Sequence, residues 1–199
     1  MNSGLSTSIL TGLAYLLGTI PFALFFSRLF GGIDPRKTGN SNPGAANVFR
    51  KVSKKAGIAV GVADAAKALV PIVIARSLGL PAWSWTLIGI AATLGHCYPF
   101  WNRFRGGMGL ATGIGMAFAM LPVPCLIISP IAIIILVASR NVGWSVGVAG
   151  IITLVLAVVL GESIGTALAA MSGVAISLIK AKIQPLRPVV PAENAKASS

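Results

Sequence analysis

Long apolar stretches alternate with short polar segments along the chain. A helix needs about 20 apolar residues to cross a bilayer, and runs near this length predict about seven spans. They are residues 5–30, 56–79, 82–100, 109–121, 123–139, 143–160 and 164–180. The pattern therefore predicts an all-α integral membrane protein, a bundle of about seven transmembrane helices.

The boundary between the fourth and fifth spans contains two closely spaced prolines, in Leu121-Pro-Val-Pro-Cys125. Proline interrupts a helix, so this segment is either a tight hairpin between two helices or a kink in one broken element. A kink would place Arg140 on the opposite side of the membrane from most of the other basic residues. We therefore predict a hairpin.

Basic residues are concentrated in alternate connections between the spans. The chain has 16 Lys and Arg residues against four Asp and Glu, a formal net charge of +12. All of the basic residues except Lys67 and Arg76 lie at the end of the first, third, fifth or seventh span or in the segment that follows it. Basic residues near helix ends favour the cytoplasmic side. The predicted topology has the N-terminus outside and the C-terminus in the cytoplasm, in the cell inner (cytoplasmic) membrane.

Composition limits the partners and cofactors. In a soluble protein this charge would suggest nucleic acid, but here the basic residues flank apolar spans, so we predict membrane lipid and phosphorylated small molecules instead. Cys97 and Cys125 lie in apolar stretches without metal-ligand spacing, so neither a metal nor another cofactor is expected. Residues 1–184 are predicted to form one transmembrane domain, and residues 185–199, with three prolines, a disordered cytoplasmic tail.

A polar loop at residues 34–50 follows the first span. It contains two glycines, three asparagines and two arginines. Glycines let consecutive backbone N–H groups face one anion, amide side chains add neutral donors, and arginine offers a two-pronged donor to phosphate. The loop is therefore either a phosphate cradle or an ordinary basic turn at the level of the lipid headgroups.

A second glycine-rich segment, residues 103–115, leads from a basic loop into the fourth span. The first N–H groups of a helix are unpaired and, together with the helix dipole, attract anions. The glycines permit close approach of an anion to the backbone, or alternatively they serve helix packing. Neither loop has the spacing of a nucleotide-binding P-loop.

Few side chains can take part in acid–base chemistry. His96 is the single histidine, and it either transfers protons or makes a structural hydrogen bond. Asp64 and Lys67 share a helix face within the second span, where they pair inside the bundle or orient the loop site. Without a nucleophile–histidine–acid set, catalysis would rely on positioning and electrostatics, which suffice for an activated substrate such as acyl phosphate.

Several motifs in the same order resemble the bacterial membrane acyltransferase family called PlsY. They span residues 14–115 and comprise Ala14-Tyr-Leu-Leu-Gly-Thr-Ile-Pro21, Asp34-Pro-Arg36, Asn42-Pro-Gly-Ala-Ala-Asn-Val-Phe-Arg50, Asp64-Ala-Ala-Lys67, Leu94-Gly-His96, Pro99 and Gly106-Gly-Met-Gly-Leu-Ala-Thr112. The resemblance implies transfer of a fatty acyl group from acyl phosphate to the 1-hydroxyl of glycerol 3-phosphate. The product would be lysophosphatidate, for phospholipid synthesis, formed without acyl-CoA or a metal.

The resemblance also implies a cytoplasmic active site built from the two loops. Arg50 would contact phosphate, and the glycine-rich segment would hold the phosphate of glycerol 3-phosphate. The expected catalytic residues are Ser41, Asn42, Asn47, Arg50 and His96. The expected substrate-binding residues are Gly44, Arg105, Gly106, Gly107, Gly109 and Thr112.

The sequence departs from the family pattern in three respects. Asn40 stands where the family has serine, although Ser41 is adjacent, and Met108 stands where the family has lysine. No match to the family's last motif is found around Ser177 to Gln184. Two alternatives therefore remain: a divergent, non-catalytic paralogue that binds phospholipid precursors, or a transporter of organic phosphates.

Overall fold

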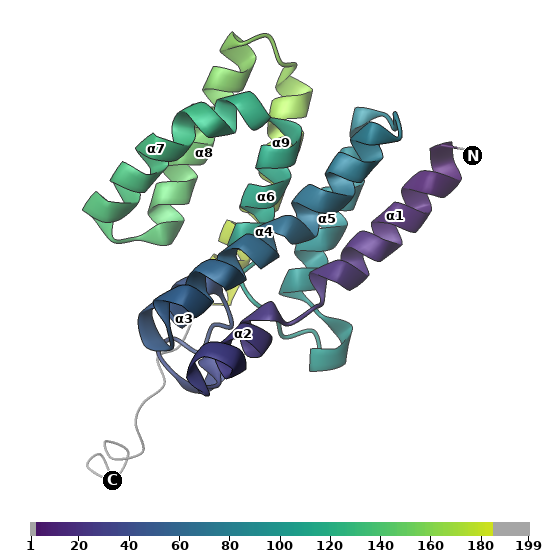
Figure 1. Ribbon diagram of the computed structural model, residues 1–199. Coiled ribbons are helices and arrows are strands. Elements are labelled where there is room, and N and C mark those ends of the chain that lie inside the picture. Colours follow the sequence, from purple (N-terminus) through teal and green to yellow (C-terminus); the bar gives the residue numbers. More distant parts are fainter. Residues whose placement is uncertain (1–2, 185–199) are drawn as a thin grey trace.

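The computed structural model describes residues 3–184, and within this range the fold is all-helical, as predicted (Figure 1). The predicted tail, residues 185–199, lies outside the described residues. The helices are α1 (Ser3–Gly18), α2 (Phe22–Gly31), α3 (Ala45–Lys51), α4 (Lys54–Ser77), α5 (Ala82–Cys97), α6 (Leu110–Met120), α7 (Pro122–Ser139), α8 (Val142–Val159) and α9 (Ile164–Ile183), with short 3₁₀ turns η1 (Pro35–Lys37) and η2 (Phe100–Asn102).

Several of these helices suit a lipid environment. Among residues 3–184, five segments are long and apolar enough to cross a membrane: α1 with α2, then α4, α7, α8 and α9. Helix α6 is a shorter apolar helix. Many large apolar side chains on these helices are exposed, among them Val137 on α7 and Ile151 on α8. Exposed apolar side chains on helices of this length are typical of surfaces that face lipid.

The first predicted span, residues 5–30, is present as the apolar segment Ser3–Gly31, but its helix is interrupted. Helix α1 ends at Gly18 and α2 begins at Phe22. Pro21 lies in the break, and proline cannot donate the backbone hydrogen bond that a continuous helix needs. The freed carbonyls find other donors: Trp101 Nε1 donates to Thr19 O at 2.8 Å, and Lys67 Nζ donates to Ile20 O at 2.7 Å.

The predicted reversal near residue 121 is present, but it differs from a tight hairpin. Only Leu121, with φ −127° and ψ 61°, separates α6 from α7. Figure 1 shows α7 leaving α6 at an open angle and lying beside α8, and α8 is its principal packing partner. The two helices are therefore separate, as predicted, although they do not pair along their length.

Glycines allow the central helices to approach closely. A Cβ on Gly18 of α1 would lie 2.3 Å from the carbonyl oxygen of Ala92 on α5. A Cβ on Gly115 of α6 would lie 2.0 Å from the carbonyl oxygen of Ala65 on α4. Real Cβ atoms do not approach other atoms so closely, so these crossings require glycine. They bring α1 close to α5, and α4 close to α6.

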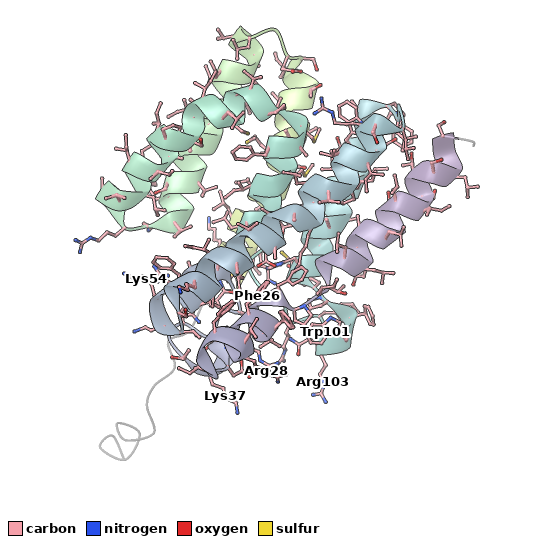
Figure 2. All side chains as sticks on the ribbon, in the orientation of Figure 1. Phe26, Arg28, Lys37, Lys54, Trp101 and Arg103 are labelled. Atoms are coloured by element: carbon pink, nitrogen blue, oxygen red, sulfur yellow. The ribbon has the colours of Figure 1, made fainter. Side chains whose placement is uncertain are left out.

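The basic side chains gather at one end of this bundle. Figure 2 shows Arg28, Lys37 and Arg103 at the lower end of the molecule, with Lys54 above them at the start of α4. The turns between α4 and α5 and between α8 and α9 lie at the upper end (Figure 1). Arg76 ends α4 near the upper end, where its guanidinium donates to Ala119 O of α6.

Candidate active site

A cleft lies at the basic end, where the break in the first span meets α4, the end of α5 and the glycine-rich segment. One wall is apolar and comes from the start of α2; the other is polar. The lining residues are Gly18, Thr19, Ile20, Pro21, Phe22, Ala23, Leu24, Arg36, Pro43, Asp64, Lys67, His96, Pro99, Trp101, Asn102, Arg105, Gly106 and Gly107. Groups for an apolar chain and for an anion therefore lie side by side.

A buried charge cluster forms the base of the cleft. Lys67 Nζ lies 2.8 Å from Asp64 Oδ1, and it donates to Ile20 O in the break of the first span. The side chains of Asp64 and Lys67 are each 2% exposed, a position that charged groups occupy in membrane helices only when paired. Pairing inside the bundle is thus confirmed. The same pair also borders the cleft.

His96 joins this cluster from the end of α5. Its Nδ1 lies 3.3 Å from Lys67 Nζ and 3.5 Å from Asp64 Oδ1. The Nδ1 atom therefore contacts both members of the buried pair. The Nε2 atom lies against the glycine-rich segment, since a Cβ on Gly107 would approach it to 2.3 Å.

The glycine-rich segment is shaped by close contacts that side chains would block. The N–H of Gly106 donates to Cys97 O at 3.0 Å, and a Cβ on Gly106 would lie 2.1 Å from His96 O. Gly109 has φ +81°, in the left-handed region that favours glycine, and directly precedes α6. The segment therefore lies flat against the end of α5 and presents its backbone.

Thr112 lies in the first turn of α6, just beyond these glycines. Its side chain is fully buried, and its hydroxyl has no hydrogen-bond partner within the described part of the chain. Other buried hydroxyls, such as that of Thr93, donate to the carbonyl one turn earlier in their helix. Thr112 lacks such a carbonyl because the preceding residues are not helical. Its hydroxyl is left with unused hydrogen-bonding capacity near the start of α6.

The first polar loop is organised by Asn47. This side chain, 3% exposed, donates from Nδ2 to the carbonyls of Pro35, Thr38 and Asn42 at 2.9 to 3.1 Å. Its Oδ1 accepts from the N–H of Asn40 at 3.4 Å. One amide side chain thus binds the backbone both before and after Gly39. Gly39 has φ +62°, in the left-handed region that favours glycine, and allows the loop to turn there.

An exposed ion pair lies at the start of the same loop. Arg36 Nη2 donates to Asp34 Oδ2 at 2.8 Å, and the Asp34 carboxylate also accepts from the backbone N–H of Arg36. The hydrogen bond from the Arg36 side chain lowers the pKa of Asp34 below its ordinary value. This contribution to stability is present above the ordinary pKa and is lost as pH falls through the lowered one.

The cleft wall includes some of the sequence-predicted residues and not others. His96, Arg105, Gly106 and Gly107 line it. The remaining predicted residues are not among those that line it: Ser41, Asn42, Gly44, Asn47, Arg50, Gly109 and Thr112. Ser41 has a left-handed backbone with φ 60°, and Arg50 ends α3 with an exposed side chain.

Two charged contributors were only partly foreseen. Arg36 lines the cleft, and its signal was the Asp34-Pro-Arg36 motif, which carried no assigned role. Lys180 of α9 is buried and donates to the carbonyls of Gly106 and Gly107. In the sequence, Lys180 could be noticed only as a basic residue at the end of an apolar helical run. The sequence could not place it beside a segment more than seventy residues away.

Comparison with known proteins identifies the family. The family model described as "Glycerol-3-phosphate acyltransferase" matches residues 8–187, nearly the whole chain. This chain belongs to that family. The resemblance carried by the sequence motifs is thereby confirmed.

Relatives named glycerol-3-phosphate acyltransferase share close to half of the matched residues. The protein from Pseudomonas paraeruginosa is 46% identical over 114 residues, which cover 57% of this chain and 60% of the relative. The protein from Anaeromyxobacter dehalogenans is 46% identical over 127 residues, covering 61% and 63% respectively. The matched region thus spans less than two thirds of the length of these relatives.

Solved structures of the same family share the fold. The glycerol 3-phosphate form of PlsY (YgiH), an integral membrane glycerol 3-phosphate acyltransferase, superimposes with a TM-score of 0.79 and is 34% identical, covering 89% of each chain. Its lysophosphatidic acid form gives a TM-score of 0.77 at 31% identity, covering 97% of this chain and 91% of the other. The chain is therefore a multi-pass integral membrane protein of this fold.

Proposed function

We propose that this protein transfers a fatty acyl group from acyl phosphate to the 1-hydroxyl of glycerol 3-phosphate, giving lysophosphatidate for phospholipid synthesis. One observation carries the proposal: in a single cleft, an apolar wall lies beside His96, two arginines and a glycine-rich backbone. Membership of the family supports the reaction. The substrate and product named for the two solved structures support the acceptor.

The two walls suit the two substrates. Ile20, Phe22 and Leu24 provide an apolar surface for the acyl chain beside the lipid. Arg105 and the segment at Gly106 and Gly107 receive the phosphate of glycerol 3-phosphate. The N–H of Gly107 is the donor, because the N–H of Gly106 already donates to Cys97 O. We further propose that Gly109 and Thr112 extend this phosphate site, because the Thr112 hydroxyl is buried without a partner among the described residues.

The reaction needs no protein nucleophile. The 1-hydroxyl oxygen attacks the acyl carbonyl carbon, the bond from that carbon to the phosphate oxygen breaks, and inorganic phosphate leaves. A phosphate oxygen of the substrates accepts the hydroxyl proton. In this proposal His96 donates a hydrogen bond from Nε2 and is not the general base, because Lys67 occupies Nδ1.

The first loop supplies the second half of the site. We propose that Asn47 holds the loop shape, and that Ser41, Asn42 and Gly44 present donors next to Pro43, which borders the cleft. Arg50 has an exposed side chain and no ion pair within residues 3–184. A free guanidinium is available for the phosphate of the acyl donor.

We also propose the membrane arrangement. The helices would make seven crossings, with α1 and α2 forming one of them, the N-terminus outside and the C-terminus in the cytoplasm. The concentration of basic side chains at the cleft end supports this sidedness in the cell inner membrane. Residues 1–184 would act as a single transmembrane domain with the active site facing the cytoplasm.

The test is an assay of the purified protein with acyl phosphate and glycerol 3-phosphate. Lysophosphatidate and inorganic phosphate should form in equal amounts, without added metal or acyl-CoA. Binding of both substrates without acyl product would instead identify a non-catalytic paralogue. Accumulation of labelled glycerol 3-phosphate inside sealed vesicles bearing the protein would favour transport.

A pH profile tests the proposed proton acceptor. The value of kcat/KM should rise through the second ionisation of substrate phosphate, near pH 6. A His96→Gln variant keeps a side-chain donor and should lower the rate while leaving the shape of the profile unchanged. If the rising limb disappears in this variant, His96 is the base and the proposed route is wrong.

A further inference from the structure

Lys180 is a buried cation beside the cleft that has no place in the proposed chemistry so far. It lies near the end of α9, and 3% of the residue is exposed. Its Nζ donates to Cys97 O at 2.5 Å, to Gly107 O at 2.7 Å and to Gly106 O at 3.3 Å. The three N–H donors of the ammonium group match three carbonyl acceptors, which offsets the cost of burying its charge.

These contacts fix the orientation of two peptide groups. The C=O and N–H of a trans peptide point in opposite directions. Because the carbonyls of Gly106 and Gly107 face Lys180, the N–H groups of Gly107 and Met108 point away from it. Gly107 itself lines the cleft. Within residues 3–184 neither N–H donates to a protein acceptor.

Two consecutive free N–H groups on one side of the backbone can donate to the same phosphate. Such a pair binds well only when its orientation is set before the anion arrives. The glycines themselves permit many orientations. Lys180 restricts these orientations by binding the carbonyl groups, on the side of the segment opposite the N–H groups that would bind the anion.

The charge of Lys180 also matters because Met108 brings none to the segment. Arg105 is exposed, so water and salt screen its charge. The ammonium of Lys180 is enclosed by protein, and the ring centroid of Tyr98 lies 4.5 Å from it. A buried charge acts through a lower effective dielectric than an exposed one.

We infer that Lys180 is the positioning residue of the phosphate site. It aims the N–H groups of Gly107 and Met108 at the phosphate of glycerol 3-phosphate, and it provides from behind the segment the positive charge that Met108 lacks. The inference rests on the proposed function for the identity of the phosphate compound.

Four variants test it in steady-state assays with both substrates varied. Lys180→Met removes charge and donors, Lys180→Gln removes the charge but keeps two donors, and Lys180→Arg keeps both. Lys182→Met is the matched control, because Lys182 is exposed on the same helix two residues further on. Thermal unfolding of each variant in detergent establishes that it is folded.

The expected effect falls on the acceptor. Lys180→Met should raise KM for glycerol 3-phosphate by about tenfold or more, the loss expected for hydrogen bonds involving a charged group. KM for acyl phosphate should change by less than about twofold, and Lys182→Met should resemble the parent protein. Lys180→Gln should lie between Lys180→Met and Lys180→Arg. A folded Lys180→Gln variant with unchanged KM for glycerol 3-phosphate would overturn the inference.

Calorimetry separates this inference from the proposed function. If the parent protein forms no lysophosphatidate, the proposed reaction fails, yet binding of glycerol 3-phosphate and inorganic phosphate can still be measured. Weaker binding by Lys180→Gln would then support the positioning role. Equal binding by parent and variant, or no binding by the parent protein, would refute it.

Discussion

The two polar loops at the cleft differ in what holds them in shape. The loop at residues 34–50 is organised from within, because the Asn47 side chain takes three of its carbonyls and accepts one of its N–H groups. The glycine-rich segment is held from outside, by Lys180 of α9 and by its contacts with the end of α5. In the first loop, the Asn47 side chain stabilises the loop itself. In the glycine-rich segment, the N–H groups of Gly107 and Met108 have no acceptor within residues 3–184.

This difference indicates how substitutions should act. Changes in the first loop should affect stability and activity together, because the same side chain supports both. Changes in the glycine-rich segment should affect activity more than stability, because other helices hold the segment in place. The following variants test that division, from the largest expected effect to the smallest.

Gly107→Ala should have the largest effect on activity. The added Cβ would lie 2.3 Å from His96 Nε2, so the ring must move from its place in the cleft. A misplacement of a catalytic group by about 1 Å costs about 100-fold in rate, which a steady-state assay would detect. The control is Gly12→Ala, where a Cβ meets nothing within 4 Å. Near-normal activity of the Gly107→Ala variant would show that His96 is not needed where it stands.

Asn47→Ala should reduce stability and activity together. It removes the side-chain donor from the carbonyls of Pro35, Thr38 and Asn42. The expected cost is about 2 kcal/mol in the free energy of unfolding, measurable by denaturant titration in mild detergent. Asn40→Ala is the matched control in the same loop, because the Asn40 side chain accepts one long hydrogen bond of 3.3 Å from Asn42 N. A stable but inactive Asn47→Ala variant would instead assign Asn47 a direct role with substrate.

The two arginines of the first loop should differ. Arg50→Gln should raise KM for acyl phosphate by about tenfold, because a free guanidinium contributes a charge-assisted pair to phosphate. Arg36→Gln should have a smaller effect, since Arg36 is already paired with Asp34 at 2.8 Å. Comparing KM for both substrates checks this order. The reverse order would mean that the arginine in the cleft wall is the phosphate ligand.

Met108→Lys should have the smallest effect of the series. A lysine here restores the charge expected from the family resemblance and should lower KM for glycerol 3-phosphate by about threefold. The modest size reflects the charge that Lys180 already provides close by. Titration with glycerol 3-phosphate measures the change. An unaltered affinity would indicate that position 108 points away from the site.

Much of the fold followed from the sequence. The positions of the apolar helices, the separation at Leu121 and the basic character of one end were all predictable, because each depends on residues near one another in the chain. The break in the first span was not predicted. One proline within an apolar run can be a kink or a full interruption, and the donors that decide between them, Lys67 and Trp101, come from distant helices.

The candidate site was likewise predictable in part: its unusual residues could be selected from the sequence, but their contacts could not. The glycine-rich segment, His96 and the Asp64–Lys67 pair could be selected from the sequence, because their residue types are unusual among apolar spans. Sequence alone left open whether His96 has an acidic neighbour and what the buried pair does. The structure places the side chains of Asp64, Lys67 and His96 in contact, so His96 does have an acidic neighbour.

By itself the sequence determined that the protein lies in a membrane, that it is helical and to which family it belongs. Hydropathy, charge and short motifs are local properties of the chain. Only the tertiary structure decided which polar groups share a cleft. Hydrogen bonds between distant segments, such as those from Lys180 to the glycine-rich segment, depend on how helices cross. Those crossings are set by close packing at glycines such as Gly18 and Gly115, which a local pattern does not reveal.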